Sequence, residues 1–396
     1  MQPPGAQPDR DFVAFLLHWH GVEQRARGLG GLDRLLRQLQ GFPMPFSELE
    51  ACILPARIAD HSPLQLDALI GSGEFVWQGD QALGPRDGYI CLYARDDFPL
   101  LGRISLFADG EREQRIRELL LGEDGLDFAA MVDRLGGFPD DVWRSLWALV
   151  WSGEVTSDSL DPLRARWSAT SSRFHPRTTP RYARRRRALP GASGRWRLLS
   201  GPDRGFAPEA ERDVARARLL LDRWGILTRR TVPGWDVLQP LLAQIAARGE
   251  ASVPRWLEAG DGFAAPGAEA VWLAFRRDGG RAVLSACDPA NPFGNPVPWP
   301  AMANAHRPRR APGARVFIYQ GRLVGYMSPT GRDIHTPENL TDPLPLMQLL
   351  QQVAAHSPVY LESIDGESPY GTAWHRPLVD AGFSPSPVGY LLRAGV

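Results

Sequence analysis

The sequence predicts an α+β fold, because helical apolar patterns dominate most of the chain and short β-prone runs dominate its end. One pattern occurs three times: an apolar helical stripe, a glycine, and then a short β-prone segment. The copies cover residues 66–75, 146–155 and 242–251. A helix that runs directly into a strand, repeated in this way, is typical of tandem winged helix-turn-helix modules. The short strands expected after residue 271 indicate a small C-terminal β-barrel.

The three copies align on Gly73, Gly153 and Gly249. Each has Leu seven residues before the glycine and Leu or Ile four residues before it, which places both side chains on one helix face. The glycine then ends the helix, because it adopts a positive φ without a steric penalty. We therefore expect these apolar residues to be buried in three separate small cores. They are Leu66, Leu69, Leu146, Leu149, Leu242 and Ile245.

The first module is expected over residues 10–105. Leucines from Leu32 to Leu39 indicate one helix, and residues 48–54 indicate another. The first copy of the repeat follows, and then a β-hairpin wing around 79–92.

The second module is expected over residues 110–166, and the third over 205–265. Helical periodicity in the second is found near 112–121, 127–135 and 140–151. The helices expected in the third cover 207–224 and 233–247. Pro139 and Asp140 are a start signal for the last helix of the second module.

The barrel-like domain is expected over residues 266–396. Short apolar runs between Gly and Pro predict strands at 271–275, 282–285, 315–319, 323–326 and 360–364. Gln320 and Gly321 form a tight turn between two of these strands, and residues 344–355 form an amphipathic helix.

Composition limits the chemistry that the chain can perform. Its 396 residues include 45 basic and 45 acidic side chains, and every basic side chain is an arginine. Without lysine there is neither a P-loop lysine nor a lysine Schiff base. Three widely spaced cysteines indicate neither a disulfide framework nor a zinc site. We expect no cofactor and no metal. No signal peptide and no long apolar run is present, so we expect a cytoplasmic, nucleoid-associated protein without a membrane partner.

Positive charge is concentrated in residues 167–204, which we expect to be a poorly ordered linker because prolines, serines and glycines interrupt it. Eleven arginines and no acidic residue lie between Leu163 and Ser200. Arginine clusters bind phosphate, so we expect contact with the DNA backbone and little sequence preference. The alternative is a basic linker that docks on the acidic modules. The candidate DNA-binding residues are Arg173, Arg177, Arg181, Arg184, Arg185, Arg186, Arg187, Arg195, Arg197, Arg229 and Arg230.

Four segments of the chain together resemble the C-terminal region of bacterial large helicase-related (Lhr) proteins. They are residues 27–77, 146–165, 284–300 (LSACDPANPFGNPVPWP) and 313–327 (GARVFIYQGRLVGYM). Those proteins are DNA helicases with a long C-terminal extension, and the motor with its ATP motifs is absent from this sequence. The extension is similar in turn to the AlkZ/YcaQ type of DNA glycosylase. The resemblance therefore implies tandem winged helices followed by a barrel.

The resemblance also implies site residues. The glycosylase signature of two glutamines around an apolar residue matches Gln38 and Gln40, with Arg57 downstream as a DNA contact. Asp288 matches an aspartate that both families place at the end of a strand. The alternatives are that the glutamines are exposed positions on a leucine-rich helix and that Asp288 forms an Asx turn at the start of a Pro-rich loop.

One carboxylate and one or two amides would suffice for base excision, because the cleavage of an N-glycosidic bond passes through a cation-like sugar. The function implied is a DNA-binding module of a DNA-repair helicase, with monofunctional DNA glycosylase activity on damaged bases as a candidate. The alternative is a non-catalytic module that assembles the helicase. The partners implied are DNA, a helicase core in cis or in trans, and further copies of the chain.

Overall fold

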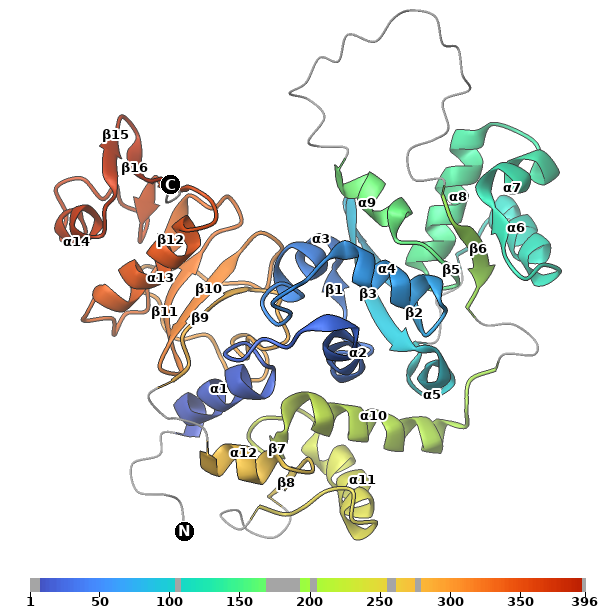
Figure 1. Ribbon diagram of the computed structural model, residues 1–396, viewed down its shortest axis with the longest axis horizontal. Helices are drawn as coiled ribbons and strands as arrows, with labels where there is room; N and C mark the ends of the chain where they lie inside the picture. The colour runs from blue at the N-terminus through green and yellow to red at the C-terminus, as the bar shows by residue number, and fades with distance from the viewer. Residues whose placement is uncertain are drawn as a thin grey trace, which may run out of the picture. The chain divides into compact units, whose positions relative to one another are not determined.

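The computed structural model describes residues 8–103, 108–168, 193–199, 205–254, 261–274 and 279–393. These residues form both helices and small, mostly antiparallel sheets, which is consistent with the expected α+β class (Figure 1). The chain divides into two compact units. We call residues 27–51 and 60–216 the central unit, and residues 1–26, 52–59 and 217–396 the C-terminal unit.

The first stretch of the central unit combines helices with a three-stranded antiparallel sheet in the order β1-β3-β2. Its elements are α2 (Gly28–Gln38), β1 (Met44–Pro45), α3 (Phe46–Glu48), α4 (Pro63–Gly71), β2 (Phe75–Leu83), β3 (Asp87–Ala94), a 3-10 turn (Arg95–Asp97) and α5 (Phe98–Leu101). A π-helical turn (Leu49–Ile53) begins in this unit and ends in the segment 52–59. Ser62 and Gln65 form a capping box at the start of α4, which satisfies backbone amides there. The hairpin of β2 and β3 is the expected wing.

The second stretch of the central unit has three helices and a sheet in the order β4-β6-β5. Its elements are α6 (Glu111–Leu121), β4 (Leu126–Asp127), α7 (Phe128–Leu135), α8 (Pro139–Trp151), β5 (Val155–Ser157), α9 (Asp161–Ser168) and β6 (Arg195–Leu198). The three helices confirm the sequence prediction closely. β6, however, falls within the segment that we expected to be a linker.

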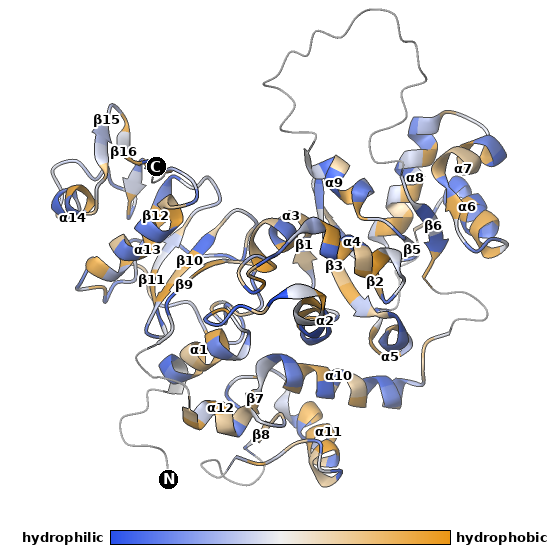
Figure 2. Cartoon of the chain, in the orientation of Figure 1, coloured by the Kyte–Doolittle hydropathy of each residue, from blue (hydrophilic) through white to orange (hydrophobic). Residues whose placement is uncertain are grey.

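β6 is ordered because its central residue, Trp196, is fully buried. The Trp196 ring lies edge-on to Trp143 and Trp147, with centroids 6.1 and 6.0 Å away. Such pairs contribute beyond the area they bury. Because side chains alternate along a strand, Arg195 and Arg197 share the other face. Figure 2 shows the hydrophilic character that they give to β6.

The burial predicted for the three repeats is confirmed, and their division into three separate cores stays a prediction. All six apolar residues named for them are buried, from Leu66 and Leu69 to Leu242 and Ile245. The glycine that follows each helix has a φ near +80°: 80° at Gly73, 81° at Gly153 and 78° at Gly249. After the second and third helices, the amide of the residue beyond the glycine donates to a carbonyl five residues earlier, which is the Schellman pattern.

The third helix pair leads into the C-terminal unit. Its elements are α10 (Glu209–Trp224), β7 (Ile226–Thr228), α11 (Trp235–Ala247) and β8 (Gly262–Ala264), and β7 pairs with β8. α1 (Pro8–Trp19) and α12 (Ala268–Ala274) also belong to this unit. The prediction of a strand at 271–275 is wrong for its described residues, 271–274, which form the end of α12. A short apolar run does not separate a buried strand from a helix, and the preceding Ala-Glu-Ala favours a helix.

A five-stranded sheet in the order β14-β12-β11-β10-β9 is the centre of the C-terminal unit. Its strands are β9 (Ala282–Ser285), β10 (Arg315–Tyr319), β11 (Arg322–Met327), β12 (Asp333–His335) and β14 (Ser363–Ile364). Gln320 and Gly321, both with positive φ, form the expected tight turn. Leu346 and Leu350 of α13 (Leu344–Ala354) pack in one core with Phe317 of the sheet. β14 and β9 are its edges among the described residues, so closure into a barrel stays a prediction.

A smaller antiparallel sheet, in the order β13-β16-β15, completes the C-terminal unit. Its elements are β13 (Val359–Leu361), α14 (His375–Asp380), β15 (Ser384–Ser386) and β16 (Gly389–Leu392). Phe383 and Tyr390 join the same core as α13.

Candidate functional site

Asp288 lies in the turn that follows β9 and is fully buried. Its Oδ1 accepts a hydrogen bond of 2.7 Å from the amide of Ala290, and its carbonyl accepts one of 3.0 Å from the amide of Asn291. These contacts form an Asx turn at the start of the Pro-rich loop, as the second interpretation of the sequence proposed. Asn291 is also buried and donates to the carbonyl of Ala286, so the turn is tied to the residue that follows β9.

Arg57 comes from the segment 52–59 and pairs with Asp288 in the same unit. Its NH1 donates to Oδ2 of Asp288 at 2.9 Å, and its NH2 donates to Oδ1. NH1 also donates to the carbonyl of Ile53 at 2.9 Å. The side chain of Arg57 is only 2% exposed, so this two-pronged contact is a buried ion pair. In this arrangement the guanidinium faces the protein interior and not solvent.

His20 is the site residue that the sequence did not indicate. It is buried at the end of α1, and its pKa is held well below the ordinary value by burial and, after that, by the positive charges of Arg57 and Arg223. A neutral imidazole therefore lies within electrostatic reach of Arg57, the arginine that binds Asp288, and of Arg223. The sequence did not predict that His20, Arg57 and Arg223 lie near one another, because many residues separate them in the chain.

Gln38 and Gln40 belong to the central unit, where α2 ends. Gln38 is half-buried, whereas Gln40 is 4% exposed and fixes the turn after the helix. Its Nε2 donates to Oδ2 of Asp97 at 2.9 Å, and its Oε1 accepts from the amide of Ala94 at 2.8 Å. Gln40 is therefore not an exposed helical position. That the glutamines and Asp288 face one site stays a prediction.

The candidate DNA-binding arginines fall into two groups. Those from Arg173 to Arg187 lie outside the described residues. Arg195 is exposed and donates to the carbonyl of Gly125 at 2.8 Å, and Arg197 lines a cavity of about 290 Å³ in the central unit. Arg229 and Arg230 are exposed in the turn after β7, where Arg229 also pairs with Asp236 at 3.1 Å.

Among the described residues, no three His, Cys, Asp or Glu side chains gather as metal ligands would. No helix in the same residues is long and apolar enough to cross a membrane.

The chain is similar in sequence to known proteins. Residues 8–95 match the family model described as "Large helicase-related protein, winged-helix domain". The chain is 32% identical over 361 residues to the "Lhr helicase/ probable uracil glycosylase" of Mycolicibacterium smegmatis, and these residues cover 82% of the chain and 23% of the relative. It is 32% identical over 351 residues to the "Lhr helicase/uracil glycosylase" of Escherichia coli, and these residues cover 77% of the chain and 22% of that relative.

The matched region contains a winged-helix domain, and the chain is a relative of the large helicase-related proteins. The matches support the expected correspondence with their C-terminal region. The chain spans less than a quarter of the length of either relative.

Proposed function

We propose that this chain is a DNA-binding module of a DNA-repair helicase and that it hydrolyses the N-glycosidic bond of a damaged base, with uracil as the first candidate. The similarity over 82% of the chain to a relative named as a probable uracil glycosylase carries this proposal. We extend the winged-helix assignment to α6–α8 with β4–β6 and to α10–α11 with β7–β8. We also propose that the five-stranded sheet is part of a barrel.

DNA would be bound mainly through its phosphates. Arg195 and Arg197 share one face of β6, and the exposed Arg229 and Arg230 occupy a turn. Guanidinium groups in such positions favour backbone contacts, which depend strongly on salt and carry little sequence information. The arginines from Arg173 to Arg187 would add to the same interaction. This mode of binding suits an enzyme that scans DNA for a lesion.

For excision, we propose Asp288 as the carboxylate that stabilises the cation-like sugar, and Gln38 or Gln40 as the amide that orients water. The target base must first leave the stack. Because Arg57 binds both oxygens of Asp288, catalysis requires that at least one of these bonds open when DNA binds. The chain contains no lysine, so strand cleavage by a lysine amine is not part of this chemistry and the product is an abasic site.

The test is incubation of the full chain with a duplex that carries one uracil, followed by treatment that cleaves abasic sites. A duplex with thymine at the same position is the substrate control. We expect cleavage products only from the uracil duplex. Asp288→Asn should abolish them while DNA affinity changes little, because Asn removes the carboxylate charge and keeps the shape of the side chain. Since this change also removes the counter-charge of the buried Arg57, the circular-dichroism spectrum of the variant must match that of the wild type. Excision that survives in Asp288→Asn contradicts the role of this residue.

The second candidate is a non-catalytic module that assembles the helicase. Hydrogen bonds within the protein engage both carboxylate oxygens of Asp288 and both polar atoms of the Gln40 amide, which favours it. In that case winged-helix surfaces would bind a helicase core or another copy of the chain. Absence of excision on all damaged duplexes, together with a defined oligomer in analytical ultracentrifugation, would support this candidate over the enzyme.

A further inference from the structure

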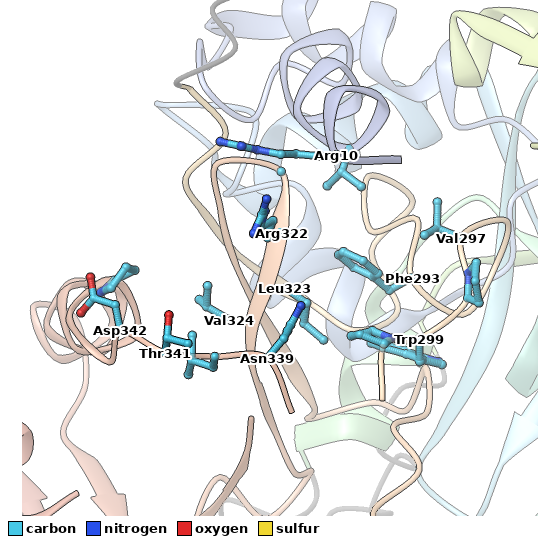
Figure 3. Close-up of a pocket in the computed structure, with 16 residues that line it drawn as sticks. Arg10, Phe293, Val297, Trp299, Arg322, Leu323, Val324, Asn339, Thr341 and Asp342 are labelled. Carbon is cyan, nitrogen blue, oxygen red and sulfur yellow. The ribbon is translucent and has the colours of Figure 1, made fainter. Parts of the chain in front are cut away.

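A cavity of about 570 Å³ opens in the C-terminal unit beside the β10–β11 turn (Figure 3). The loop 293–300, the start of β11 and residues 339–345 form its walls. The volume is within the usual range for small-molecule sites. Asp288 does not line this cavity, so the cavity is separate from the carboxylate proposed for excision.

One wall of the cavity is aromatic. The rings of Phe293 and Trp299 stack with centroids 6.0 Å apart and planes 23° apart, and Tyr326 meets Trp299 edge-on at 5.7 Å. Gly294 makes room for the indole, because a Cβ at that position would lie 2.5 Å from its Nε1. Trp299 is nevertheless only half-buried. Its ring is thus held in place by neighbours while part of it faces the cavity.

The remaining walls of the cavity carry polar side chains, with positive charge on one side and a carboxylate on another. Arg10 and Arg322 lie on one side of the cavity, and Asn339 and Asp342 come from another segment (Figure 3). Arg10 is fixed there, since its Nε donates to the carbonyl of Gln320 at 2.7 Å and its NH2 to the Gln320 side chain at 3.0 Å. Asn339 and Asp342 are exposed and offer both a donor and acceptors.

We propose that this cavity binds one nucleotide of single-stranded nucleic acid. The base stacks on Trp299, the phosphate lies at Arg322, and Asn339 and Asp342 meet the hydrogen-bonding edge of the base. A planar ring with a π face suits Trp299, and a phosphate suits the guanidinium side of the cavity, away from the Asp342 carboxylate. In a duplex the faces of a base are stacked and its Watson–Crick edge is paired. Only an unpaired nucleotide therefore offers the ring face and this edge to the protein at the same time. The inference rests on the DNA binding proposed above and adds a single-stranded contact to it.

Photo-crosslinking tests this placement directly. A single-stranded oligonucleotide with 5-bromodeoxyuridine at its centre is irradiated with the full chain, and the modified peptide is identified by mass spectrometry. We expect the modification at Trp299 or Phe293. Competition with a free deoxynucleoside monophosphate distinguishes the two sources of a nucleotide: loss of the crosslink at millimolar monophosphate would identify a mononucleotide site, and persistence would identify a strand site.

Affinity measurements complete the test. Arg322→Ala should weaken binding of the single strand several-fold and lower the slope of log K against log[salt] by about one, while Arg376→Ala, an exposed arginine of the same unit outside the cavity, should change neither. Trp299→Ala should weaken it by roughly tenfold or more, and Trp299→Phe by less, because stacking is retained.

Binding of an undamaged duplex is measured in parallel with the same variants. Crosslinks that map elsewhere, or equal effects of the Arg322 and Arg376 substitutions, overturn the cavity proposal and leave duplex binding intact. If the wild-type chain binds neither single-stranded nor duplex DNA, both proposals are overturned. Arg322→Ala and the crosslink position remain decisive even if Trp299→Ala does not fold.

Discussion

Arg57 donates hydrogen bonds to both carboxylate oxygens of Asp288, a residue 231 positions later in the chain, and both side chains are buried. The contact fastens the segment 52–59 to the turn after β9 within the C-terminal unit. Because Asp288 also accepts the amide of Ala290, its oxygens are engaged on two sides. The pair therefore contributes to the fold, and any catalytic use of Asp288 must open it.

Substitution of either partner should be costly. Asp288→Leu leaves the Arg57 guanidinium buried without a counter-charge, and Arg57→Met leaves the carboxylate in the same state. We expect each single change to lower the free energy of unfolding by about 3–5 kcal/mol. The double variant should lose much less than the sum, because neither charge is then stranded. Urea unfolding of the four proteins measures this coupling, and additive losses would show that the two side chains are not energetically coupled.

The neutral state of His20 predicts a pH dependence. Burial and then the charges of Arg57 and Arg223 lower its pKa in the folded protein, so the unfolded chain binds a proton more readily below pH 6.5. The stability contribution is complete above this pH and is lost as the pH falls. The slope is at most about 1.4 kcal/mol per pH unit. Urea midpoints between pH 7.5 and 5.5 should fall less steeply for His20→Gln than for the wild type.

His356→Gln is the matched control, since His356 is exposed in the same unit. His306 and His335, whose pKa values are also lowered by burial first, add to the acid sensitivity of all variants. The decisive quantity is therefore the difference between His20→Gln and the wild type. Identical slopes would mean that His20 takes up a proton without disturbing its surroundings.

Local signals in the sequence were enough to predict most of the helices. The glycines of the repeat and their apolar stripes depend only on neighbours in the chain, so α8 and α11 were found close to their observed bounds and α4 was expected at its place before Gly73. Failures occurred where distant contacts decide the outcome. β6 is stabilised by the packing of Trp196 on α8. The apolar run of α12, which by itself is ambiguous between strand and helix, packs on α1, where Trp272 contacts Phe15.

The same distinction applies to the candidate site. Asp288, Gln38 and Gln40 were found through resemblance and residue type, but their partners lie far away in the sequence. No periodicity predicts that Arg57 binds Asp288 across 231 positions or that Gln40 binds Asp97. Of these residues, only Asp288 had a local feature that could be predicted from its neighbour, because Asp before Pro favours an Asx turn.

The arginines of β6 predict a salt-dependent contact with DNA. If Arg195 and Arg197 meet phosphates, replacing either with Ser should lower the slope of log K against log[salt] for a duplex by about one. Arg134→Ser is the control, because Arg134 is exposed in the same unit and pairs with Glu123. Fluorescence anisotropy at several salt concentrations gives the slopes. Equal slopes for all three variants and the wild type would remove β6 from the DNA interface.

Two glycines of the repeat provide a matched pair for the last prediction. Gly153 and Gly249 end equivalent helices with φ values of 81° and 78°, so Ala at either position has the same backbone strain, about 1–2 kcal/mol. Their surroundings differ. A Cβ at 153 would lie 3.0 Å from Nε2 of Gln78 and 3.2 Å from the carbonyl oxygen of Gly79, whereas one at 249 meets nothing within 4 Å.

Gln78 has little freedom to move aside. It is buried, its Nε2 donates to the carbonyls of Gly153 and Arg103 at 2.9 and 3.0 Å, and its Oε1 accepts from the amide of Arg103 at 3.1 Å. Any shift that accommodates a methyl group weakens these bonds. Gly153→Ala should therefore destabilise the protein by roughly 1–3 kcal/mol more than Gly249→Ala, since overpacking adds to the shared strain. Urea unfolding compares the two variants, and equal losses would show that the Gln78 network yields to a methyl group without cost.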